Sequence, residues 1–106
     1  MTEPARIAAL RDEIDALDEQ LVALLNARAR CALEIGDIKR VLQMEIYQPD
    51  RERAVLQHVR SVNEGPLDGD AIARLFERII DEARRIERVV QQAHQDGQPP
   101  SSTPND

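Results

Sequence analysis

The sequence predicts an all-α protein, a chain of three helices with a very long first helix. Apolar residues recur at steps of three and four through three long segments, which is the spacing of the buried edge of an amphipathic helix. Pro, Gly and Asn cluster mainly between these segments, where turns are expected, and at the C-terminal end. The sequence contains no alternating strand pattern, no repeat and no glycine-rich phosphate loop.

The first helix is expected from about Pro4 to about Leu42, because proline is tolerated in a first turn. One member of its apolar stripe, Arg28, is charged. The stripe runs through Ile7, Leu10, Ile14, Leu17, Leu21, Leu24, Arg28, Cys31, Ile35, Ile38 and Leu42. Gly36 is the weak point, since glycine costs about 1 kcal/mol in a helix interior. An alternative is that the helix breaks near Gly36 and folds back.

The second helix is expected to open at Pro49-Asp50 and to stop at Asn63-Glu64-Gly65-Pro66. The third is expected to start after Asp68, a suitable N-cap residue. Their inward residues are predicted to be Val55, Leu56, Val59, Val62, Ile72, Leu75, Phe76, Ile79, Ile80, Ala83, Ile86 and Val90. We expect residues 1–95 to form one helical domain and residues 96–106 to form a disordered C-terminal tail.

The composition of the chain argues against several classes of binding partner. A net charge of −6 and 2% aromatic residues argue against a nucleic-acid partner. No signal peptide or membrane-spanning run is recognised, so no membrane partner is expected. The single Cys31 fits a cytoplasmic location and is expected to be a buried structural thiol. His58 and His94 have no Cys or carboxylate at ligand spacing, so no metal site is assigned.

The length of the first helix predicts an oligomer. A helix of about 38 residues is roughly 57 Å long, whereas a compact domain of this size has a radius of gyration of about 13 Å. Two shorter helices cannot cover such an apolar seam within one chain. We therefore expect a homodimer in which two chains share their long helices.

Most arginines have an acidic residue one helical turn away and are expected on solvated faces. These are Arg30, Arg40, Arg53, Arg60 (with Glu64), Arg74, Arg78, Arg84 and Arg85. Arg28, Lys39 and Arg51 have no such partner. Arg88 has none either, but it lies in the last turns of its helix, where the helix dipole and water suffice.

These three cations admit two interpretations. Arg28 and Lys39 share one helix face at about 16 Å, and Arg51 lies in the first turn of the second helix beside Glu52. They either form internal ion pairs with acids of other helices or line a pocket for a small polyanion. The arginine fork matches carboxylates, so we favour the pocket.

Glu87 continues the line of Phe76, Ile80 and Ala83 by one turn, so it is expected to point inward. Apolar surroundings disfavour the ionised carboxyl, and a protonated carboxyl can donate a hydrogen bond. The alternative is a salt bridge from Glu87 to Arg84 or to one of the unpaired cations.

The chain resembles the all-helical class of chorismate mutase over about residues 6–90. The ordered fragments that carry the resemblance are Leu10-Arg11-Asp12-Glu13-Ile14-Asp15, Leu17-Asp18, Leu24-Leu25-Asn26-Ala27-Arg28, Ile35-Gly36-Asp37-Ile38-Lys39, Pro49-Asp50-Arg51-Glu52 and Asn63-Glu64-Gly65-Pro66-Leu67. The resemblance implies an intertwined, domain-swapped dimer with two composite active sites. It also implies a Claisen rearrangement of chorismate to prephenate, toward phenylalanine and tyrosine, with no cofactor.

The resemblance also implies roles by position. Arg28 and Arg51 would bind the carboxylates of chorismate, and Arg11 would reach in from the partner chain. Arg11 and Arg28 are about 25 Å apart along one helix, too far to serve one small ligand in cis. Lys39 would donate to the ether oxygen, and Glu52 would hold the ring hydroxyl.

Three positions depart from the commonest family pattern. Glu87 stands where glutamine is frequent, and only its neutral form can donate to the ether oxygen. Ala83 replaces a frequent serine, and Gln48 stands where some relatives carry aspartate. We expect one lost substrate hydrogen bond at Ala83 and either modest turnover or help from an activating partner protein.

Two rival functions remain at this point. One is an isochorismate pyruvate lyase on the same scaffold, which also uses a pericyclic step in a cationic pocket. The other is a non-catalytic helical dimerisation module whose cations pair internally. Feedback by aromatic amino acids is not expected, because the chain has no room for a separate effector domain.

Overall fold

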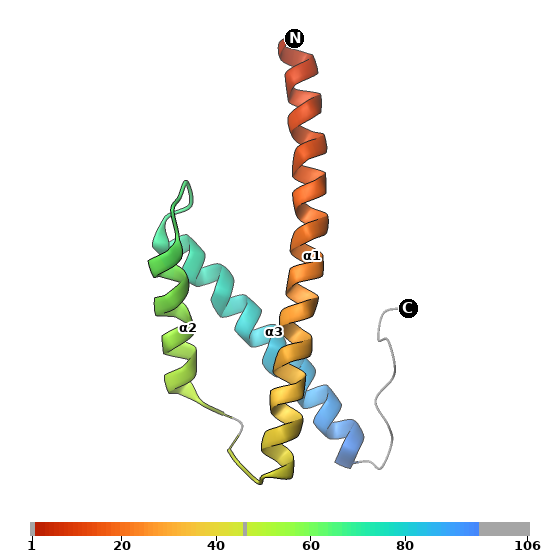
Figure 1. Ribbon diagram of the computed structural model, residues 1–106, viewed down its shortest axis with the longest axis vertical. Coiled ribbons are helices and arrows are strands. Elements are labelled where there is room, and N and C mark those ends of the chain that lie inside the picture. Colours follow the sequence, from red (N-terminus) through yellow and green to blue (C-terminus); the bar gives the residue numbers. More distant parts are fainter. Residues whose placement is uncertain (1, 46, 96–106) are drawn as a thin grey trace. The chain divides into compact units, whose positions relative to one another are not determined.

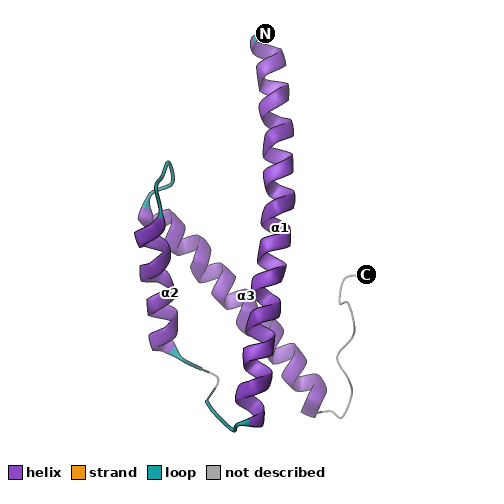
Figure 2. Cartoon of the chain, viewed as in Figure 1, coloured by secondary structure: helices purple, strands orange, loops and turns teal. Residues whose placement is uncertain are grey.

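The fold of residues 2–45 and 47–95 is described here from a computed structural model, and these residues form three helices and no strand. They are α1 (Glu3–Val41), α2 (Pro49–Val62) and α3 (Gly69–Gln95) (Figures 1 and 2). The predicted all-α class and the three predicted segments are confirmed. The predicted tail, residues 96–106, lies outside the described residues.

The chain divides into two compact units, Met1–Cys31 and Ala32–Asp106. The first unit consists of the N-terminal part of α1. The second holds the C-terminal turns of α1 together with α2 and α3. Across the described ranges, none of the helices has both the length and the hydropathy needed to cross a membrane.

The C-terminal part of α1 is helical through Gly36, so the alternative in which the helix breaks there is wrong. The helix ends one turn later in a Schellman motif. The Met44 N–H donates to the Lys39 carbonyl at 2.8 Å, and the Gln43 N–H donates to the Arg40 carbonyl at 3.2 Å. Gln43 takes the left-handed conformation that closes the motif, with φ 58°. Glycine usually fills this position, because a Cβ is strained there.

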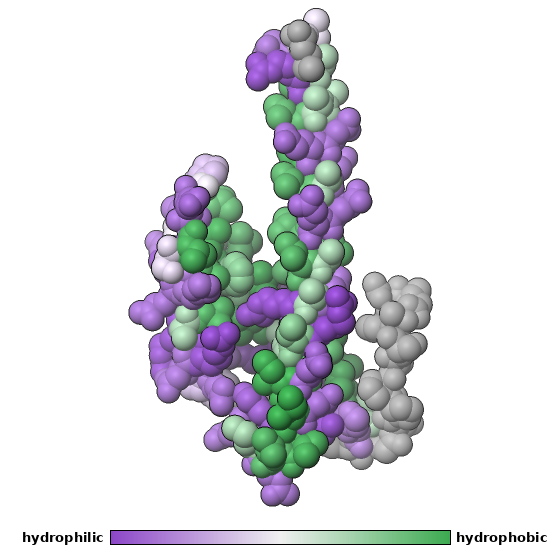
Figure 3. Space-filling model, viewed as in Figure 1, coloured by the Kyte–Doolittle hydropathy of each residue, from purple (hydrophilic) through white to green (hydrophobic). Residues whose placement is uncertain are grey.

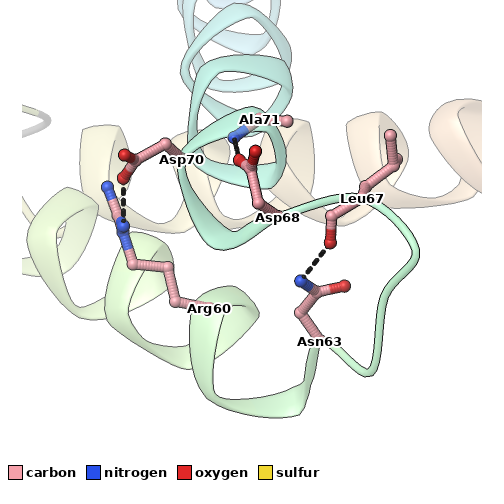
Figure 4. Close-up of polar contacts among 6 residues, drawn as sticks. All are labelled: Arg60, Asn63, Leu67, Asp68, Asp70 and Ala71. Carbon is pink, nitrogen blue, oxygen red and sulfur yellow. Dashed lines mark hydrogen bonds and ion pairs between the residues drawn. The ribbon is translucent and has the colours of Figure 1, made fainter.

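Side-chain hydrogen bonds hold the turn between α2 and α3 (Figure 4). The Asn63 side-chain amide donates to the Leu67 carbonyl at 2.7 Å, and its Oδ1 accepts from the Gly65 N–H at 3.1 Å. Gly65 has φ 77°, which suits glycine. The Asp68 carboxylate accepts from the Ala71 N–H at 2.7 Å, so the predicted N-cap of α3 is confirmed.

Arg60 also ties α2 to α3, by a pair that differs from the predicted one. Its guanidinium donates to Asp70 at 2.7 Å, in the first turn of α3, and not to Glu64 (Figure 4). Glu64 lies in the turn beyond the end of α2, whereas the packing of α2 on α3 brings Asp70 opposite Arg60. The same contact holds the pKa of Asp70 below its ordinary value.

The core of the second unit is small. Ala73 and Ile80 of α3 are its buried apolar residues, at 4% and 9% exposure. Leu75 and Val62 were predicted to face inward but are 54% and 60% exposed. Within the second unit, α2 and the last turns of α1 have too little surface to enclose both faces of α3. Part of the predicted core is therefore exposed to solvent.

The apolar stripe of α1 is exposed in the chain, and no described residue of α1 is buried. Figure 3 shows apolar side chains following the N-terminal part of this helix. Within the first unit there is only one helical segment, so the stripe has nothing to pack against. The prediction that Cys31 is buried is wrong for the same reason, because its thiol is exposed.

We expect Gln43→Gly to raise the free energy of unfolding by about 1 kcal/mol, because glycine adopts the left-handed conformation without a Cβ clash. The measurement is denaturant unfolding followed by circular dichroism. Gln57→Gly is the matched control: Gln57 is an exposed α2 interior residue, where glycine lowers stability by about 1 kcal/mol. Equal destabilisation by both changes would contradict this account of the end of α1.

Candidate functional site

The predicted site residues are divided between the two units. Arg11 and Arg28 belong to the first unit. Arg11 is exposed and Arg28 is half-buried, and neither forms a hydrogen bond or ion pair with any described residue. The remaining members belong to the second unit: Lys39, Gln48, Arg51, Glu52, Ala83 and Glu87.

Glu87 and Lys39 are brought together inside the second unit. The Glu87 carboxyl lies against α1 at Gly36, where an added Cβ would meet Glu87 Oε2 at 3.5 Å. Lys39 stands in the last turn of α1 and is half-buried. Its charge acts on the Glu87 carboxyl, although the two side chains do not form an ion pair within 4 Å.

Partial burial raises the pKa of the Glu87 carboxyl above its ordinary value. The positive charges of Lys39 and Arg84 oppose the shift but do not cancel it. Leu33 and Val90, which line the same small hollow as Glu87, supply apolar surface that desolvates the carboxyl. The alternative salt bridge from Glu87 to Arg84 is not formed, because Arg84 contacts Glu52 and Asp81.

The start of α2 carries the next group of predicted residues. Arg51 is exposed and has no ion-pair partner among the described residues. Glu52, one position later, is half-buried and accepts a hydrogen bond from Arg84. Gln48 is exposed at the N-cap position, where its side chain makes no capping hydrogen bond. Ala83 is half-buried in α3 and supplies no polar group.

Arg84 is the residue that the sequence analysis missed, because it was assigned to a solvated face. Its guanidinium pairs with Glu52 of α2, lies 3.7 Å from Asp81 and stands 5.9 Å from the centroid of the Tyr47 ring. Counting acids one turn away identifies Asp81 and Glu87, but not Glu52. The contact with Glu52 depends on how α2 packs on α3, which local spacing does not reveal.

Arg11, Arg28, Lys39 and Arg51 therefore form no ion pair with a described residue, and neither do Arg30, Arg74 and Arg88. Ion pairs do form at Arg40–Asp37, Arg53–Asp50, Arg78–Glu82 and Arg85–Glu82. A cation that acts on a protonatable carboxyl, as Lys39 does on Glu87, suits an anionic ligand that also accepts a hydrogen bond. No group of three or more His, Cys, Asp or Glu side chains with metal-site geometry occurs among residues 2–45 and 47–95. Fold and side chains together define an all-helical protein with the components of a cationic ligand site.

Comparison with known proteins identifies the family. A sequence model of chorismate mutase type II matches residues 10–88. The chain therefore belongs to the chorismate mutase type II family.

Curated relatives agree with this assignment. The chain is 37% identical over 99 residues to a bifunctional chorismate mutase/prephenate dehydratase of Stutzerimonas stutzeri, covering 89% of this chain and 27% of that protein. It is 36% identical over 95 residues to the bifunctional protein of Escherichia coli K12, covering 89% and 25% of the two chains. The chain thus spans about a quarter of the length of these relatives.

Solved structures extend the likeness to the fold. Chorismate mutase (Form II) of Thermus thermophilus matches with a TM-score of 0.76 at 34% identity, over 78% of this chain and 94% of that one. Chorismate mutase of Helicobacter pylori, solved in complex with prephenate, matches with a TM-score of 0.72 at 31% identity, over 79% and 91% of the two chains.

We expect Glu87 to titrate above the ordinary range of a glutamate, as followed by the carboxyl carbon chemical shift in NMR. Lys39→Met removes a positive charge that favours the carboxylate, so it should raise the pKa of Glu87 further. Lys39→Arg keeps the charge and serves as the control. A pKa of Glu87 at or below its ordinary value would show that burial does not dominate at this carboxyl. A lower pKa of Glu87 in Lys39→Met than in the wild type would show that the Lys39 charge does not favour the carboxylate.

Proposed function

We propose that this chain is a chorismate mutase that converts chorismate to prephenate by a Claisen rearrangement. The observation that carries the proposal is that the charge of Lys39 acts on a carboxyl, Glu87, which lies against α1 at Gly36 and whose neutral form is favoured by burial. Both can donate a hydrogen bond to one acceptor. Membership of the chorismate mutase type II family and the prephenate complex of the Helicobacter pylori protein support the choice of substrate.

The reaction is unimolecular, so it requires neither a nucleophile nor a cofactor. Catalysis comes from holding the enolpyruvyl side chain over the ring and from placing donors where negative charge develops. Lys39 and protonated Glu87 donate to the ether oxygen. Arg28 and Arg51 bind the two carboxylates of the substrate, and Glu52 accepts from the ring hydroxyl.

At two positions the side chain offers the substrate weaker hydrogen bonding than the residue common in the family. Ala83 has no hydroxyl to offer, and Gln48 places a neutral amide where some relatives carry a carboxylate. We therefore propose modest turnover by the chain alone, which leaves scope for activation by a partner protein. A single cysteine suits the reducing cytoplasm, where we place this activity.

A second copy of the chain completes the proposed site. Six residues of the apolar stripe in the first unit are about half or more exposed: Ile7, Leu10, Ile14, Leu17, Leu21 and Leu24. Burying an aliphatic side chain contributes about 1.5–3 kcal/mol, so this stripe favours pairing with another helix. We propose an intertwined, domain-swapped homodimer in which Arg11 of one chain serves the site built around Arg28 of the other.

The direct test of the activity is incubation of the purified protein with chorismate and, separately, with isochorismate. We expect prephenate from chorismate, measured by loss of chorismate absorbance and by chromatography of the product. Release of pyruvate from isochorismate, with no prephenate formed, would instead support the lyase on the same scaffold. No turnover of either substrate would favour a helical dimerisation module.

Arg28→Met separates a ligand site from a structural ion pair. A ligand-binding arginine has no protein counter-charge to lose, so we expect kcat/KM to fall by about a hundredfold or more while the melting temperature stays the same or rises. If Arg28 instead forms a buried ion pair within an assembly, its removal should lower the free energy of unfolding by about 3–5 kcal/mol. Arg30→Met, at an exposed position two residues along α1, is the matched control.

We expect activity to rise as pH falls through the pKa of Glu87, because only the protonated carboxyl donates to the ether oxygen. Since burial raises this pKa, the active form extends to higher pH than an ordinary glutamate would allow. Glu87→Gln donates at every pH, so its kcat/KM should lack this limb. A pH–rate profile that is the same in both proteins would contradict the assigned role of Glu87.

A further inference from the structure

Arg84 links three segments of the second unit. It projects from α3, pairs with Glu52 in the first turns of α2, and lies over the ring of Tyr47 in the segment that precedes α2. A guanidinium within about 6 Å of an aromatic centroid is attracted by the face of the ring. These two contacts fix the position of the Arg84 head group more closely than an exposed arginine would be fixed.

Burial sets the Arg84–Glu52 pair apart from the surface pairs of the same helix. The Glu52 side chain is 25% exposed and the Arg84 side chain 42%, whereas Arg85 and Arg78 are 63% and 76% exposed. The Nε atom of Arg84 is buried and has no hydrogen-bond partner among the described residues. A partly desolvated, charge-assisted contact restrains both side chains more than a solvated pair does.

The atoms in contact leave Glu52 able to bind a second group. Arg84 Nη2 donates to Glu52 Oε1, and Glu52 Oε2 has no hydrogen-bond partner among the described residues. A carboxylate can accept through both oxygens at once. One oxygen is thus held by α3 while the other remains available to a hydroxyl.

We propose that Arg84 is a positioning residue for Glu52, orienting its carboxylate so that the free oxygen accepts from the ring hydroxyl of the substrate. This inference rests on the function proposed above. Arg84 acts only through Glu52 and does not touch the reacting atoms. Its removal therefore loosens substrate binding without removing a donor from the ether oxygen.

The experiment is a double-mutant cycle on chorismate turnover with Arg84→Met, Glu52→Ala and the double variant. In the wild-type background, Arg84→Met should raise KM about tenfold and change kcat by less than about threefold. In the Glu52→Ala background the same change should alter KM by less than about twofold, because the carboxylate that it orients is gone. Arg85→Met, which removes the neighbouring surface pair with Glu82, should leave both constants unchanged.

Arg84→Lys tests the charge and keeps the cycle usable if Arg84→Met does not fold. A lysine ammonium still donates to Glu52 but lacks the planar fork, so its KM should lie between those of wild type and Arg84→Met. If Arg84→Met still raises KM tenfold in the Glu52→Ala background, the positioning role is overturned. KM values of Arg84→Met and Arg84→Lys that equal the wild-type value would overturn it as well. An inactive wild-type protein would instead overturn the proposed function itself, so the two failures are distinct.

Discussion

An arginine or lysine that is partly desolvated needs an anion to offset its charge, and the proposed site depends on this requirement. Arginine keeps its charge at every physiological pH, so the need cannot be met by releasing a proton. Arg28 and Lys39 are half-buried yet have no ion-pair partner among the described residues. Two of the exposed arginines of α3, Arg78 and Arg85, do have one. A half-buried cation that has no counter-charge within its own chain is what a site for an anionic ligand requires.

Contacts within the second unit explain how the Glu87 carboxyl remains available as a hydrogen-bond donor near Lys39. Arg84 is bound to Glu52 and Asp81, so it does not form an ion pair with Glu87. Burial against α1 then outweighs the more distant positive charges, and the pKa of Glu87 rises. In the proposed mechanism, the α2–α3 packing thus gives two glutamates opposite tasks. Glu52 accepts a hydrogen bond, and Glu87 donates one.

Most of the secondary structure could be predicted from the sequence, because helix periodicity and capping residues such as Asp68 act locally. The unpaired state of Arg28, Lys39 and Arg51 was predictable for the same reason. The partners of Arg60 and Arg84 were not, since Asp70 and Glu52 come opposite them only when α2 packs on α3. The exposure of Cys31 was also missed. An apolar stripe shows that a residue prefers burial, but not whether the covering surface belongs to the same chain.

We propose that cations of two chains complete one anion site, and mixing two inactive variants tests this proposal most directly. Arg11→Ala and Arg28→Ala should each abolish mutase activity alone. Mixed at equal amounts and refolded together, they should recover about a quarter of wild-type activity, because half of the dimers hold one site with both arginines intact. Mixtures that stay as inactive as the separate variants, although heterodimers form, would contradict a site shared between chains.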